Sequence, residues 1–182
     1  MKNIFIVLVC LFVSFDILAQ VARQKDSHEH GAAKLMMVME GKKLQVEFEV
    51  PSESLIGFEH FPKSQSNRMN FNGAIKILSD PSKLLSTPFK AECLLVGMNV
   101  SQSLFSNEEE HGHDESEKSE IHSEFISKYH WNCEHLDEID SIGSQLMNIF
   151  PRIEEIRVRW ITKNNQGSIE LESKDDRIKG WK

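Results

Sequence analysis

The strict alternation of residues 44–50, LQVEFEV, constrains the fold of this chain more than any other feature. Apolar residues occupy every second position, and polar residues occupy the positions between them. Successive side chains of a strand point to opposite faces, so the segment predicts a strand with one buried face. The strand-like run KLMMVME at 34–40 precedes it, with Gly41 and Lys42 between the two. We therefore expect a β-hairpin that ends at Pro51.

The middle of the chain predicts one helix and a second pair of strands. Residues 52–62 have the composition of a loop, and residues 65–79 predict a helix that ends before Pro81. Residues 91–105 are apolar and strand-like, and residues 120–133 alternate with period two. An acidic, histidine-containing segment separates these two strands. We expect a long hairpin with an expanded connection.

The last third of the chain predicts the same order again. Residues 136–150 predict a helix, with acidic residues in its first turn and Pro151 after its end. Residues 153–162 and 168–173 predict a final hairpin. The fold class expected from the sequence is therefore α+β, as a single antiparallel ββαββαββ domain with an expanded acidic, His-containing hairpin loop.

The first residues predict a cleaved secretory signal peptide. Lys2 is followed by an apolar run at residues 4–15, which is too short to span a bilayer comfortably, and Ala19 is small enough to precede a cleavage site. We expect a periplasmic protein with no stable membrane insertion after cleavage. The expected organisation is a signal peptide at 1–19, a His-containing arm at 20–32, a domain at 33–174 with an acidic/His loop at 106–119, and a C-terminal tail at 175–182.

Export affects how the cysteines are interpreted. The mature chain keeps Cys93 and Cys133. An even pair in an oxidising compartment predicts a disulfide, and a pair of metal-binding thiolates is the alternative.

Charge and motif content exclude several classes of function. The chain has a net charge of −7 at pH 7, and residues 107–120 hold seven carboxylates and one lysine. No basic patch is present, so we expect no nucleic-acid partner. The chain also lacks a hydrolase motif, a phosphate-binding glycine loop and a CxxC pair, so we expect no enzymatic activity.

The acidic segment contains a candidate metal site. His111, His113 and Asp114 surround a flexible glycine, and His122 follows. Imidazole and carboxylate groups suit Zn²⁺, which takes about four ligands, and the other acids concentrate cations nearby. The alternative is a solvated acidic linker.

A second candidate group follows from the topology of the first hairpin. The start of its first strand lies beside the end of its second. The arm and the segment GFEH at 57–60 therefore leave the hairpin at the same end, where His28, His30, Glu59 and His60 can meet. As an alternative, His60 between two phenylalanines is a hydrogen-bonded structural histidine.

Five short segments together resemble a known family. They are HEHG before the first strand, GFEHFP after the second, AEC at 91–93, WNC at 131–133 and IFP at 149–151. This combination resembles the ZrgA-like family of periplasmic zinc-binding proteins over most of the mature chain. The resemblance implies zinc binding in the periplasm and support of zinc uptake alongside an ATP-driven importer. It implicates His28, His30, Glu59, His60, His111 and His113.

The sequence therefore predicts a periplasmic zinc-binding protein. It would bind Zn²⁺ and either buffer it or deliver it to an ATP-driven zinc importer or to the importer's periplasmic binding component. The alternative function is a non-metal structural or interaction domain of the cell envelope, whose acidic loop contacts another protein.

Overall fold

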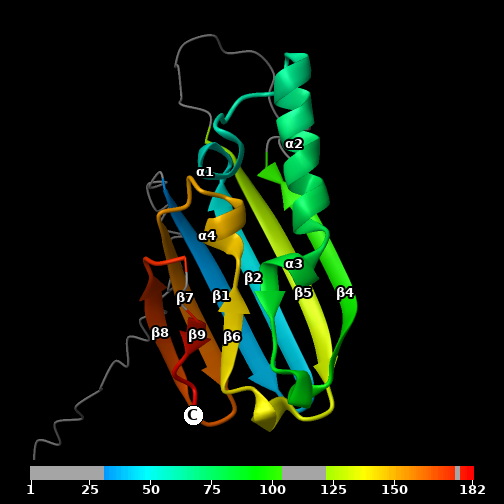
Figure 1. Cartoon of the computed structure of the whole chain (residues 1–182), viewed down its shortest axis with the longest axis vertical. Coiled ribbons are helices and arrows are strands. Elements are labelled where there is room, and N and C mark those ends of the chain that lie inside the picture. The colour runs from blue at the N-terminus through cyan, green and yellow to red at the C-terminus, as the bar shows by residue number, and fades with distance from the viewer. Residues whose placement is uncertain (1–30, 104–121, 175–176) are drawn as a thin grey trace, which may run out of the picture.

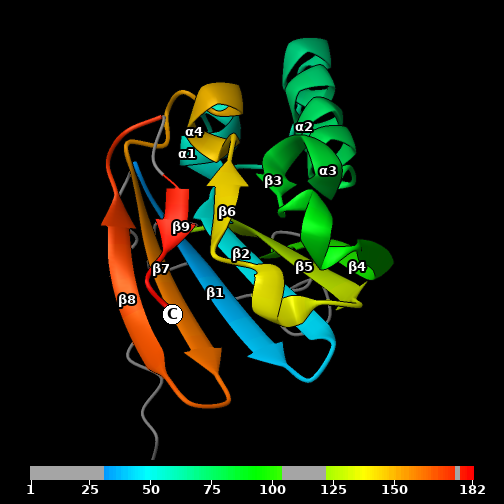
Figure 2. The same cartoon turned by 60° about the horizontal axis from the view of Figure 1, so that its bottom comes forward.

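The computed structural model describes residues 31–103, 122–174 and 177–182. A six-stranded sheet, in the order β4-β5-β2-β1-β7-β8, forms one layer. A three-stranded sheet, in the order β3-β6-β9, and the helices cover one face of it (Figures 1 and 2). The strands are β1 (Ala32–Glu40), β2 (Lys43–Pro51), β3 (Leu85–Ser86), β4 (Cys93–Gln102), β5 (Glu124–Cys133), β6 (Ser141–Ser144), β7 (Glu155–Thr162), β8 (Gln166–Leu171) and β9 (Arg177–Lys179). The helices are α1 (Ser52–Ile56), α2 (Gln65–Leu78), α3 (Pro81–Leu84) and α4 (Leu146–Ile149), with 3-10 turns η1 (Phe89–Ala91) and η3 (Leu136–Glu138).

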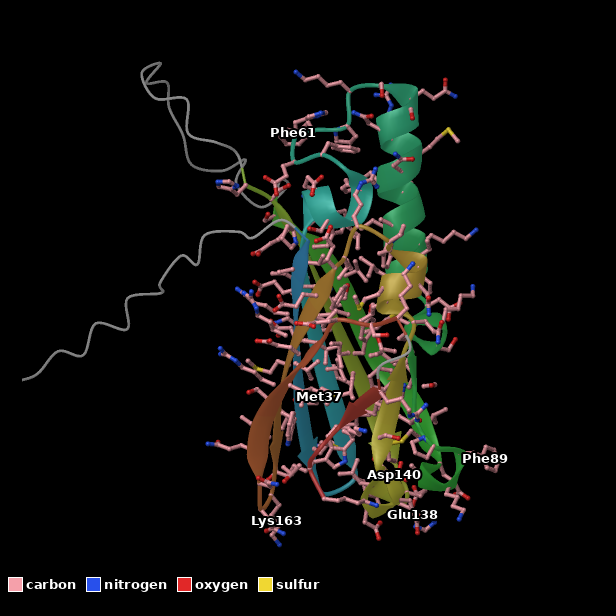
Figure 3. The ribbon with its side chains drawn as sticks, turned by 60° about the vertical axis from the view of Figure 1, so that its left-hand side comes forward. Met37, Phe61, Phe89, Glu138, Asp140 and Lys163 are labelled. Carbon is pink, nitrogen blue, oxygen red and sulfur yellow. A yellow bond between two sulfur atoms is a disulfide. The ribbon has the colours of Figure 1, made fainter. Side chains whose placement is uncertain are left out.

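The predicted first hairpin is confirmed. β1 and β2 pair antiparallel from Lys34 opposite Glu49 to Glu40 opposite Lys43. The alternating apolar residues of both strands are buried, and Met37 lies between the two layers with no exposed surface (Figure 3). Each large apolar side chain contributes about 1.5–3 kcal/mol on burial. The buried residues of β1 and β2 therefore hold the sheet against the second layer.

The predicted helix at 65–79 is confirmed as α2. Its first turn is capped by Ser64, whose hydroxyl accepts a hydrogen bond from the backbone N–H of Asn67. Its last turn is tied to β5, because the Tyr129 hydroxyl donates to the carbonyl of Leu78 over 2.8 Å. The helix is therefore fixed to the sheet by a buried hydrogen bond as well as by apolar contact.

The predicted disulfide is also present. β4 and β5 pair antiparallel on either side of residues 104–121, with Cys93 directly opposite Cys133. The two cysteines form a disulfide, which excludes the thiolate-ligand alternative. The cross-link lies at the end of the β4–β5 pair farthest from the acidic segment.

The sheet is mixed rather than antiparallel. The final hairpin, β7 and β8, is present as predicted, but β7 pairs parallel with β1, from Ala32 opposite Glu155 onward. A parallel pair needs a long crossover. In this fold the chain reaches β7 from β5 through residues 134–154, which pass through the second layer before returning to the sheet.

The prediction of a helix over 136–150 was wrong. These residues form η3, strand β6 and the short α4. β6 pairs with both β3 and β9, and Gly143 lies so close to Ser86 that a Cβ would meet the Ser86 hydroxyl at 2.4 Å. The pairing of β6 with β3 and β9 therefore outweighs the weak helix preference, which was inferred from the acidic residues at the start of the segment and from Pro151 after its end.

Two other segments differ from expectation. The predicted loop at 52–62 begins with the five-residue helix α1. Residues 177–182, which the sequence placed in a tail, contribute β9 and Trp181, whose indole N–H donates to the buried Ile139 carbonyl over 2.8 Å. These C-terminal residues are therefore part of the second layer and not a tail.

We expect the disulfide to be a major source of stability. Replacing Cys93 and Cys133 together by alanine should lower the free energy of unfolding by roughly 3–4 kcal/mol, because the cross-link closes a loop with a sequence separation of 40 in the unfolded chain. Urea unfolding followed by circular dichroism measures the change, and reduction of the parent protein serves as the matched control. An unchanged urea midpoint after reduction would contradict the expectation.

Tyr129 should make stability fall at alkaline pH. Burial raises the pKa of Tyr129 to about 12, while the unfolded chain has the ordinary value near 10.0. Between these two values the unfolded state loses the proton first, so stability is intact below pH 10 and declines as pH rises toward 12. Tyr129→Phe should lack this decline, which is on the order of 2 kcal/mol.

The measurement is direct because the chain contains one tyrosine. Absorbance at 295 nm should titrate near pH 12 in the folded protein and near pH 10 in urea. A folded-state midpoint near pH 10 would show that the hydroxyl is not buried as described.

Candidate metal centre

The candidate site lies at the end of the sheet where β2 and β4 end and β5 begins. α1 follows β2 directly and ends at Gly57, which has a φ of +86° and donates its N–H to the Glu53 carbonyl over 2.8 Å. Left-handed backbone favours glycine. The Arg152 guanidinium also lies 3.1 Å from the position that a Cβ would take. Gly57 therefore ends the helix and directs Phe58 and Glu59 back toward the sheet.

Buried serines fix the backbone around this turn. The N–H of Ser52 donates to the carbonyl of Ser123 over 2.8 Å, and the Gln102 amide donates to the Ser52 hydroxyl over 3.2 Å. The Ser123 hydroxyl in turn donates to the carbonyl of Glu59 over 3.3 Å. Ser52 and Ser123 are almost fully buried. These bonds hold the ends of three strands and the GFEH turn in one arrangement.

Glu59 and His122 meet at this end. Nδ1 of His122 lies 3.3 Å from Oε2 of Glu59, and their side chains are 30% and 15% exposed. The carboxylate only accepts, so Nδ1 carries the proton and the lone pair of the neutral imidazole is on Nε2. The other oxygen, Oε1 of Glu59, is buried and has no hydrogen-bond partner among the described residues. A buried unpaired carboxylate oxygen and a basic imidazole nitrogen suit a cation.

His60 is held in a similar way but by the backbone. Its Nδ1 lies 2.8 Å from the carbonyl oxygen of Phe61, and its ring stacks on Phe58 with centroids 4.9 Å apart. The carbonyl accepts, so Nε2 is again the basic nitrogen. These contacts agree with the structural alternative for His60 and also leave its Nε2 chemically suited to bind a metal.

Five predicted ligands cannot be placed. His28, His30, His111, His113 and Asp114 lie outside the described residues. Gly31, which follows His30, donates its N–H to the Ser54 hydroxyl of α1 over 2.9 Å, and His122 is the first described residue after the acidic segment. Both segments therefore join the fold at the end that carries Glu59. Within the described ranges, no group of three or more His, Cys, Asp or Glu side chains is arranged to hold a metal.

The pairing of Glu59 with His122 was missed from the sequence. The sequence pattern groups Glu59 with the N-terminal arm and His122 with the acidic segment, whereas in the structure these two residues, 63 positions apart, are in contact. The register of β2 against β5, with Pro51 opposite Glu124, brings them together. The spacing of Glu59 and His122 in the sequence does not indicate this contact, because the contact forms only when β5 pairs with β2.

The remaining described histidines lie elsewhere. His130 is exposed on β5, on the face of the sheet opposite the second layer, beside Gln45 in the register. His135 is exposed next to η3, at the other end of the strands. Neither lies beside Glu59, and His130 provides a comparison residue for binding experiments.

A family model described as "ZrgA family zinc uptake protein" matches residues 27–180. The chain belongs to the ZrgA family. This match confirms the family indicated by the five short segments and gives the chain a role in zinc uptake. A comparison with curated proteins finds no match. In the described parts of this ZrgA family chain, no helix is long and apolar enough to cross a membrane.

Gly57 should be required for the stability of this end. Gly57→Ala should lower the free energy of unfolding by about 1–2 kcal/mol, because alanine is strained at positive φ and its Cβ would press on Arg152. Gly73→Ala is the matched control, since Gly73 lies in α2 with nothing within 4 Å of a Cβ. That variant should be neutral or more stable by up to ~1 kcal/mol. Equal thermal shifts for the two variants would contradict the role given to Gly57.

Proposed function

We propose that this ZrgA family protein captures zinc in the periplasm and passes it to an ATP-driven importer or to the importer's binding component. The observation that carries the proposal is the Glu59–His122 contact. It places a partly buried carboxylate and an oriented imidazole where the acidic, histidine-containing segment joins the domain. Zinc is the cargo of this protein rather than a catalytic cofactor.

We assign His122 as a ligand through Nε2 and Glu59 as the group that orients it. A carboxylate that accepts from the second ring nitrogen fixes the tautomer and makes the ligating nitrogen more basic. Zinc takes about four ligands, so His122 alone is not enough. We propose that the others come from the segments that join at this end: His28, His30, His111, His113 and Asp114, with His60 as a further candidate.

Delivery fits a site of this kind better than permanent storage. Any backbone or side-chain freedom that ligating residues lose on binding a metal lowers the affinity. The carboxylates around His111 and His113 raise the local concentration of cations whether or not they bind the metal. Fast capture combined with moderate affinity lets the metal move on to a tighter acceptor.

Zinc affinity should depend on His122 and Glu59. His122→Ala should weaken zinc binding at least tenfold, and Glu59→Gln should weaken it by roughly 10–100-fold, since orienting groups have effects of this size. Affinity should also fall as pH drops through about 6.5, because protonated imidazole cannot bind metal. Chelator competition and calorimetry on the mature chain measure both effects.

Two controls make the test specific. His130→Ala removes an exposed imidazole from the opposite face, and Glu47→Gln removes a carboxylate that pairs with Lys128 over 3.0 Å. Neither should change zinc affinity. Equal weakening by His130→Ala would refute the proposed location. Absence of zinc binding by the parent at neutral pH would favour the alternative, an interaction domain of the envelope.

A further inference from the structure

Exposed apolar side chains gather on β4 and on the 3-10 turn before it. Leu94, Val96 and Met98 are 70%, 62% and 47% exposed, and Leu95 is 38% exposed. Phe89 in η1 is 95% exposed and projects from the end of the molecule opposite Phe61 (Figure 3). Single exposed apolar residues are ordinary, but a cluster of this kind marks an interaction surface.

β4 is also an edge strand. Among the described residues it ends the six-stranded sheet and pairs only with β5, so no other described strand lies along its outer side (Figure 1). Backbone N–H and C=O groups on the outer side of an edge strand can pair with another strand. No charged residue occurs from Cys93 to Ser103, although charge is the usual protection of an exposed edge. One irregularity in the register, between Leu95 and Gly97, interrupts the strand.

The opposite edge of the same sheet differs. β8 has six residues, contains Glu170 and is followed by Glu172 and Lys174. A shorter strand with nearby charges resists pairing with another sheet. The uncharged, ten-residue edge is therefore confined to β4.

We propose that β4 pairs edge to edge with β4 of a second copy of this chain, about a two-fold axis. An uncharged strand meets no like charge in any antiparallel register against itself, and its apolar residues lie beside those of the second strand on the faces of the joined sheet. The acidic segment of the same chain is a poor partner for the edge of β4, because its seven carboxylates would lie against apolar side chains.

The pairing joins two six-stranded sheets into one and leaves the metal ends accessible. β4 runs from Cys93 to Gln102, and Gln102 is bonded to Ser52 beside the candidate metal centre. Antiparallel pairing places the Gln102 ends of the two copies at opposite ends of the joint. The dimer is therefore independent of zinc, and each copy keeps its own metal-binding end.

Sedimentation velocity of the mature chain in EDTA tests the proposal, since EDTA removes any zinc bridge between copies. The parent should form dimers over the micromolar range. Met98→Lys should raise the dimer dissociation constant by roughly 100-fold or more, because a charge would be buried without a partner at the joint. Met36→Lys is the matched control: Met36 is 49% exposed but lies on β1, inside the sheet, and its variant should dimerise like the parent.

Folding and the identity of the interface are checked separately. Circular dichroism and the absence of free thiols should be the same in all variants, and Val96→Lys replaces Met98→Lys if the latter does not fold. Amide hydrogen exchange should show protected β4 amides in the parent that become fast in the lysine variant. A parent that is monomeric at all concentrations overturns the proposal. So does a dimer that survives both β4 substitutions.

Discussion

Pairing with a strand on each side fixes the register of β2, and this register determines both the buried core and the position of the candidate site. β2 lies between β1 and β5, and its buried residues contact the second layer. A slip of one residue would turn every buried side chain of the strand toward water. The same register sets the metal end, because Pro51 opposite Glu124 places the turn after α1 beside His122. The fold and the candidate site are thus consequences of one strand alignment.

The two ends of the β4–β5 pair have different roles. At one end the Cys93–Cys133 disulfide joins the strands covalently. At the other end, buried hydrogen bonds around Ser52 and Ser123 hold the strand ends, and the acidic segment connects them. A loop can be long and highly charged without loss of the fold when the strands on either side are fixed independently of it. This arrangement lets the chain keep a cation-attracting segment in the middle of its sequence.

Local patterns in the sequence predicted the elements whose cause is local. Period-two alternation predicted the hairpin β1–β2 and the strand β5, and the end signals around Pro81 predicted α2. The parallel pairing of β7 with β1 and the strand β6 were not predicted, because they depend on partners far along the chain. The candidate site was likewise predicted only in part. Residue chemistry selected Glu59 and His122 separately, and only the register of β2 with β5 brings them into contact.

We propose that zinc binds His122 through Nε2 while Glu59 holds Nδ1. Long-range ¹H–¹⁵N NMR of the imidazole nitrogens, recorded before and after addition of zinc, can test this binding mode. The Nε2 resonance of His122 should move to a metal-bound position while Nδ1 stays protonated, and the nitrogens of His130 should not move. Unchanged His122 nitrogens in a protein saturated with zinc would contradict it.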